Sequence, residues 1–218
     1  FARERASILA GVHDISQEFY LTESTNSLIN SSFAVGPELS RSGKNGASIY
    51  PTTGLAVMGR VQPTQALKLR AGIYDAVPGE LGEPKGTHLR LSKDEGYLGI
   101  AEANYSYEAR HQKGNVGIGY WRYSREQEHR LKKEDEPVQK VLSQGFYGLL
   151  NQKIYRELEG TDLGLSGFIR VGVATDGANP ITESLATGFS YLGILPSRLE
   201  DTASIGIAIV RSGGAEFA

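Results

Sequence analysis

The fold class is decided by residues 55–74, which read LAVMGRVQPTQALKLRAGIY. In both halves of this stretch, every second residue is apolar or small, and the residues between are mostly polar or long. The two apolar series are Leu55, Val57, Gly59 and Val61, followed by Leu67, Leu69, Ala71 and Ile73. A period of two is typical of strands whose faces meet different surroundings. Residues 63–65, PTQ, predict a tight turn between the halves, so we expect a β-hairpin.

Similar alternation recurs along the chain and predicts an all-β protein. About ten segments qualify as strands: 7–12, 28–35, 55–62, 67–74, 96–107, 115–123, 143–155, 162–173, 184–194 and 202–211. One helix-compatible stretch, residues 124–136, carries a run of mixed charges and ends before Pro137. We interpret it as a solvated loop or a short surface helix, since such charge runs usually stay in water.

The predicted connections alternate between short and long. Short ones fall at 63–65, 108–114, 156–161 and 195–201, and longer ones at 36–54, 76–95, 124–142 and 174–183. This arrangement is typical of an antiparallel transmembrane β-barrel, with short periplasmic turns and long extracellular loops. The connection 13–27 breaks the pattern, because it is long where the alternation predicts a short one. It could contain either a short helix or a bulge.

Composition excludes several classes of protein. A formal net charge of -2 offers no basic surface for nucleic acid, and the absence of Cys excludes a disulfide framework and a Cys nucleophile. No apolar run reaches the roughly 18 residues of a membrane helix, whereas a barrel strand needs only alternation. The four histidines lack metal-ligand spacing, and no nucleophile or nucleotide-binding motif is present. We therefore expect no enzyme activity, no cofactor and no metal.

The face opposite the apolar one is small and polar with isolated cations, which suits a water-filled lumen better than the surface of a soluble sandwich. Sugars are bound by planar polar groups and aromatic faces. Alternation therefore selects these lumen candidates for sugar binding: Arg60, Lys68, Arg70, Glu102, Asn104, Trp121 and Arg170. Each charge could equally serve to hold water and structure in place. Trp121 shares a face with Gly117 and Gly119, which would leave open space for stacking on a sugar ring; its alternative is an interfacial anchor.

The connection 36–53 is long and rich in Gly, Ser and Asn, and it carries Arg41 and Lys44 as further candidates. It could fold into the pore as a constriction or remain an exposed extracellular loop.

Several short motifs, in this order and spacing, resemble the carbohydrate-selective porin (OprB-type) family. They are residues 30–33 (NSSF), 41–46 (RSGKNG), 48–54 (SIYPTTG), 62–64 (QPT), 71–75 (AGIYD) and 86–88 (GTH). The resemblance extends from about residue 10 to 211. It implies a bacterial outer-membrane barrel of about sixteen strands that contacts lipid and lets glucose and similar sugars diffuse inward without catalysis.

About ten predicted strands are fewer than the sixteen that the resemblance implies. We therefore expect the chain to be a fragment, with one domain over residues 1–218 that is incomplete at both ends, because an open sheet would leave unpaired backbone groups in lipid. Two other functions stay open, an outer-membrane barrel for polysaccharide export or assembly and a soluble carbohydrate-binding β-sandwich. The sequence fixes neither the sugar nor whether the chain forms a homo-oligomer.

Overall fold

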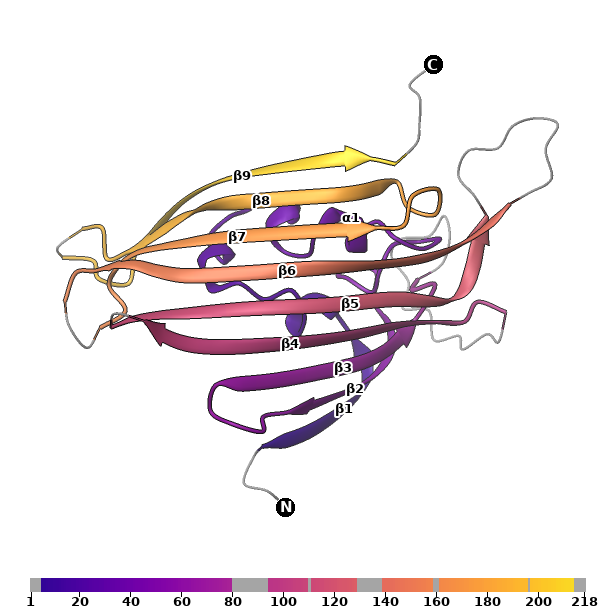
Figure 1. The fold of residues 1–218 in the computed structure, drawn as a ribbon, viewed down its shortest axis with the longest axis horizontal. Coiled ribbons are helices and arrows are strands. Elements are labelled where there is room, and N and C mark those ends of the chain that lie inside the picture. The colour runs from indigo at the N-terminus through magenta and orange to yellow at the C-terminus, as the bar shows by residue number, and fades with distance from the viewer. Residues whose placement is uncertain are drawn as a thin grey trace.

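The computed structural model describes residues 5–79, 94–109, 111–128, 139–158, 161–195 and 197–213. These residues form a single antiparallel sheet of nine strands, in which neighbours in sequence are neighbours in space (Figure 1). The strands are β1 (Ala6–His13), β2 (Gly54–Val61), β3 (Leu67–Asp75), β4 (Tyr97–Ala109), β5 (Gln112–Glu128), β6 (Lys140–Arg156), β7 (Gly164–Ala174), β8 (Ile181–Leu192) and β9 (Thr202–Ser212). The sheet is open, with β1 and β9 at its edges.

Nine of the predicted strands are confirmed, and the strand expected at 28–35 is wrong. That region holds a 3-10 helix, η3 (Ser31–Phe33), where the Asn30 side chain accepts a hydrogen bond from the Ser32 backbone N–H at 2.9 Å. Short polar side chains that bond their own backbone compete with strand pairing. The apolar alternation of 28–35 therefore does not lead to a strand.

The helix-compatible stretch 124–136 is also corrected in part. Residues 124–128 continue β5, after a register shift between Arg122 and Glu126. Residues 129–136 lie outside the described residues.

The absence of a strand at 28–35 explains why the predicted connection 13–27 did not fit the alternation of loop lengths. β1 pairs directly with β2, so residues 14–53 form one long connection at the long-loop end of the sheet. The alternation of loop lengths then holds from β1 to β7. It fails in the last pair, where the connection 175–180 is shorter than 193–201, because β8 spans Ile181–Leu192 and so both begins and ends earlier than the predicted strand 184–194.

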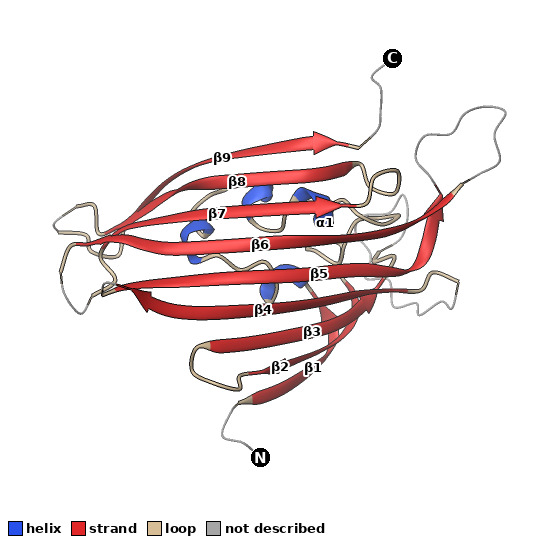
Figure 2. Ribbon diagram, viewed as in Figure 1, coloured by secondary structure: helices blue, strands red, loops and turns tan. Residues whose placement is uncertain are grey.

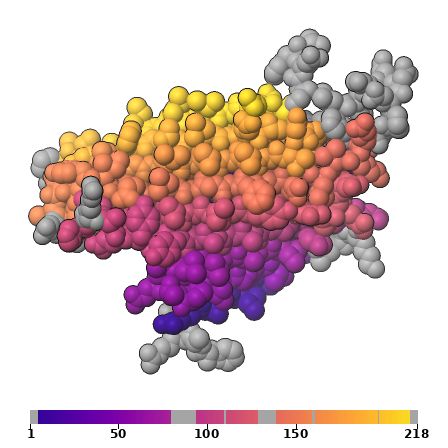
Figure 3. Space-filling view, viewed as in Figure 1, coloured from indigo at the N-terminus to yellow at the C-terminus, as the bar shows by residue number. Residues whose placement is uncertain are grey.

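The alternation of faces is as predicted. Large apolar side chains on the outer face are exposed, with exposed fractions of 55% for Val57, 63% for Ile118 and 58% for Ile207. The face turned to the viewer in Figure 3 is this outer face, where neighbouring strands form a continuous surface. No helix in the described part of the chain is long and apolar enough to cross a membrane.

Residues 14–53, here named the inner segment, lie against the opposite, inner face of the sheet (Figure 2). The segment contains η3 and three other short helices: η1 (Ile15–Gln17), η2 (Glu23–Thr25) and α1 (Pro37–Ser40). Its Ile15, Phe19 and Leu39 are fully buried in a cluster with Leu98 and Trp121 of the sheet. The core of the structure therefore lies between the inner segment and the inner face.

Candidate pore-lining site

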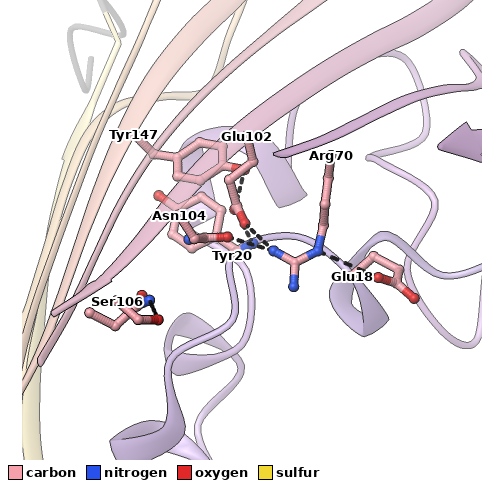
Figure 4. Close-up of polar contacts among 8 residues, drawn as sticks. Glu18, Tyr20, Arg70, Glu102, Asn104, Ser106 and Tyr147 are labelled. Atoms are coloured by element: carbon pink, nitrogen blue, oxygen red, sulfur yellow. Dashed lines mark hydrogen bonds and ion pairs between the residues drawn. The ribbon is translucent and has the colours of Figure 1, made fainter. Parts of the chain in front are cut away.

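Three of the predicted lumen residues meet on the inner face of β3 and β4. Arg70 and Glu102 are opposite each other in the register of these strands, and Asn104 follows Glu102 on the same face. Arg70 Nη1 donates to Glu102 Oε1 at 3.0 Å and to Asn104 Oδ1 at 2.5 Å. Glu18 of the inner segment adds a carboxylate 3.6 Å from Arg70 Nε (Figure 4).

Glu102 also attaches the inner segment to the sheet. Its Oε2 accepts hydrogen bonds from the Tyr20 backbone N–H at 2.8 Å and from the Tyr147 hydroxyl at 2.7 Å. The rings of Tyr20 and Tyr147 stack with centroids 4.0 Å apart. Because Glu102 is only 3% exposed, its charge depends on these donors and on Arg70.

Gly119 makes the position of Tyr147 possible. The two residues are opposite each other in β5 and β6, and the Tyr147 ring lies over Gly119. A Cβ at Gly119 would overlap this ring. The glycine is therefore required by close approach of a side chain rather than by its backbone conformation.

Arg170 on β7 forms a second attachment, separate from the Arg70 cluster. Its Nη1 donates to the carbonyl of Phe33 and its Nη2 to the carbonyl of Ala34 at 2.6 Å. Its guanidinium also lies over the Tyr20 ring, 4.6 Å from the centroid. A planar guanidinium suits two adjacent acceptors, because its N–H donors are held in a fixed fork.

A third attachment centres on Glu38 of α1, which is 1% exposed. The carboxylate accepts hydrogen bonds from the Tyr20 hydroxyl and from the Ser184 hydroxyl of β8, both at 2.5 Å. Burial, and then the neighbouring Glu38 charge, raise the pKa of the Tyr20 hydroxyl well above its usual value. Tyr20 therefore stays neutral and keeps donating to Glu38.

The expectation of open space beside Trp121 is wrong. Trp121 lies on the inner face, as its parity predicts, but its side chain is 0% exposed and contacts Tyr123 edge to face. Side chains fill the space over the neighbouring glycines, Asn104 over Gly117 and Tyr147 over Gly119. Its position on the inner face also contradicts the interfacial-anchor alternative.

The remaining candidates are more accessible. Arg60 is exposed on the inner-face side of β2, and Lys68 is half-buried on β3. Arg41 and Lys44 are exposed in the inner segment. Sugar binding by any of the predicted residues stays a prediction.

Sequence reasoning missed Glu18, Tyr20 and Glu38, which all belong to the inner segment. No periodic signal marks them, because their positions depend on contacts with distant strands. Tyr147 could have been found, since its parity in β6 places it on the inner face. Among the described residues, no group of three or more His, Cys, Asp or Glu could hold a metal ion.

The chain resembles known proteins both in sequence and in fold. It matches the family model described as carbohydrate-selective porin, OprB family, over residues 1–214. A structure of Pseudomonas putida OprB at high pH superposes with a TM-score of 0.78 at 17% sequence identity, covering 96% of this chain and 51% of that chain. The chain thus spans about half the length of the solved structure that it matches. No curated protein matches it.

Proposed function

Because this chain belongs to the carbohydrate-selective porin, OprB family, we propose that it forms part of an outer-membrane barrel through which small sugars such as glucose diffuse passively. The observation that carries this proposal is the contrast between its two faces. The outer face exposes apolar side chains that suit lipid, while the inner face holds hydrogen-bonded charges and the inner segment.

The inner segment would narrow such a pore to the size of small solutes. It is held at several points across the sheet, by Glu102 of β4, by Asn151 of β6 and by Arg170 of β7. The Ser42 hydroxyl also lies 3.1 Å from the Tyr123 hydroxyl of β5. Buried hydrogen bonds at this many places favour a fixed constriction over a mobile gate.

Within this pore, we assign two roles to the predicted residues. The accessible ones, Arg41, Lys44, Arg60 and Lys68, would offer donors to sugar hydroxyls. The buried ones, Arg70, Glu102, Asn104 and Arg170, would instead shape the passage by holding the inner segment. Trp121 has no place among the sugar contacts, because it is fully buried.

Liposome swelling with the complete gene product tests the proposal. We expect glucose to enter faster than a small neutral amino acid of similar size, and a disaccharide to enter more slowly than glucose because of the constriction. Equal entry of glucose and the amino acid would indicate a general porin. Absence of swelling by folded, inserted protein would contradict the pore itself and favour export or assembly.

A further inference from the structure

Tyr20 of the inner segment has a backbone conformation that is rare for a large residue. Its φ is +67°, and the residue is only 2% exposed. In the described part of the chain, the other residue besides glycine with a positive φ is His111, in the β4–β5 turn. The left-handed region brings a Cβ close to the following carbonyl oxygen, which disfavours it roughly fivefold to thirtyfold. Tyr20 therefore needs contacts that hold it there.

These contacts involve both the backbone and the side chain of Tyr20. The backbone N–H donates to Glu102 Oε2 of β4, and the hydroxyl donates to Glu38 Oε1 of α1 (Figure 4 shows the first of these). The ring stacks on that of Tyr147 of β6, and the guanidinium of Arg170 of β7 lies over it. Three strands and a helix thus fix the same residue.

The positive φ is what allows both hydrogen bonds of Tyr20 to form together. The N–H and the side chain are attached to opposite ends of the N–Cα bond, so φ sets the angle between them. A φ near −63°, the α-helical value, would turn the side chain by about 130° around this bond relative to the N–H. The bond to Glu102 or the bond to Glu38 would then break. The strained backbone therefore connects a strand of the sheet to α1.

Tyr20 also lies at the bend between two halves of the inner segment. Directly before it, the Phe19 ring packs edge to face on Tyr74 of β3, with ring centroids 6.3 Å apart. After it, the Ser24 backbone N–H donates to Asn151 of β6 at 3.2 Å. The bend thus directs the following residues away from β3 and across the sheet. A change of φ at this one position would move all of them relative to the inner face.

We propose that Tyr20 is a positioning residue that sets the largest sugar admitted by the pore, because its left-handed backbone holds residues 21–34 against the inner face. The inference rests on the proposed pore and assigns the size limit of that pore to one residue. While the bend is held, the segment presents a fixed edge that excludes solutes larger than a monosaccharide. When the bend relaxes, the segment can move, and a disaccharide passes during the fraction of time that the segment is displaced.

The test compares Y20A with Y20G in liposomes that contain the complete gene product. Both variants lose the ring and the hydroxyl, so they differ only in the Cβ and in the freedom of the backbone. Glycine adopts the left-handed region without a steric cost and keeps its N–H directed at Glu102, whereas alanine is strained there. We expect the ratio of maltose entry to glucose entry to be roughly fivefold higher in Y20A than in Y20G. A ring that served only for packing would give equal ratios.

The matched control is the pair H111A and H111G. His111 has a φ of +62° and is exposed in the β4–β5 turn, outside the inner segment. The same exchange of Ala for Gly changes the same kind of backbone strain at this position. Both variants should therefore keep the wild-type ratio of maltose entry to glucose entry.

Two outcomes would overturn the proposal. The first is a ratio in Y20G that equals or exceeds the ratio in Y20A, when both variants keep the heat-dependent gel migration of a folded barrel. If either variant does not fold, Y20F decides, because it keeps the ring and loses only the bond to Glu38. Its ratio should exceed that of the wild type roughly tenfold, and an unchanged ratio is the second outcome. Failure of glucose to enter through folded wild-type protein would instead contradict the proposed pore, so the two failures are distinguishable.

Discussion

Replacing Arg170 with Met should release the inner segment from the sheet while the strands stay paired. Arg170 is 2% exposed and donates to two backbone carbonyls of the inner segment, those of Phe33 and Ala34. Met keeps an unbranched apolar stem like that of Arg but ends short of the guanidinium, so most of the packing against the sheet is kept. What the variant loses is the donors for two buried acceptors and the cation above the Tyr20 ring.

The loss of docking free energy in R170M can be worked out from these contacts. Hydrogen bonds to a charged donor contribute about 1.5–3 kcal/mol each, and a desolvated cation–π contact contributes up to about 2 kcal/mol. Removing a buried guanidinium also removes its desolvation cost, which offsets part of the loss. We expect the docking of the inner segment to weaken by about 3 kcal/mol, which raises the population of the undocked state roughly a hundredfold.

Limited trypsin digestion measures that population. The bond between Arg41 and Ser42 is a tryptic site inside the inner segment, and Ser42 is 0% exposed with its hydroxyl donating to the Leu39 carbonyl at 2.6 Å. Cleavage there requires local opening, so its rate follows the undocked fraction when reclosing is fast. Mass spectrometry of the fragments separates this cut from cuts elsewhere.

The control variant is R122M, which makes the same chemical change on the outer face, where Arg122 is exposed. It should leave the rate of the Arg41 cut unchanged. If R170M also leaves this rate unchanged, the attachment through Arg170 does not hold the inner segment and our reasoning about it is wrong. In planar bilayers, R170M should also show larger and noisier conductance than R122M.

Three further predictions concern the lipid face, a close contact and pH. I169R should destabilise the inserted protein by about 2–4 kcal/mol because it places a cation in lipid, whereas S166R on the inner face of β7 should destabilise it less. Urea unfolding in detergent compares the two variants, and equal losses of unfolding free energy would contradict the assignment of faces. G119V should cost about 1–3 kcal/mol by displacing the Tyr147 ring, and stability equal to wild type in the same assay would refute that close approach. Because the folded-state pKa of Tyr20 is raised, the stabilisation that Tyr20 gives to the docked inner segment is complete below pH about 10 and is lost as the pH rises through the raised pKa. The conductance of the wild type should rise in that pH range, and an equal rise in Y20F would exclude Tyr20 as the cause.

How far the sequence predicted the structure differs between the sheet and the inner segment. Strand positions and faces were predictable because alternation is a local property: the parity of Arg70, Glu102 and Arg170 placed all three on the inner face. The strand at 28–35 failed because the same alternation arises in a segment whose polar side chains bond their own backbone. Parity also cannot say what covers a face, so Trp121 was placed on the correct side but wrongly expected to be accessible.

The fold class, the succession of the strands and the assignment of side chains to the inner or outer face could all be predicted from the sequence, because each of these follows from neighbouring residues and short turns. The folding of residues 14–53 back onto the inner face, and their attachment there by Tyr20 and Glu38, is seen only in the folded chain. The contacts responsible join residues far apart in the sequence. Tyr20 meets Glu102 and Glu38 meets Ser184 only after the sheet has brought distant strands together, and no local pattern encodes such a contact.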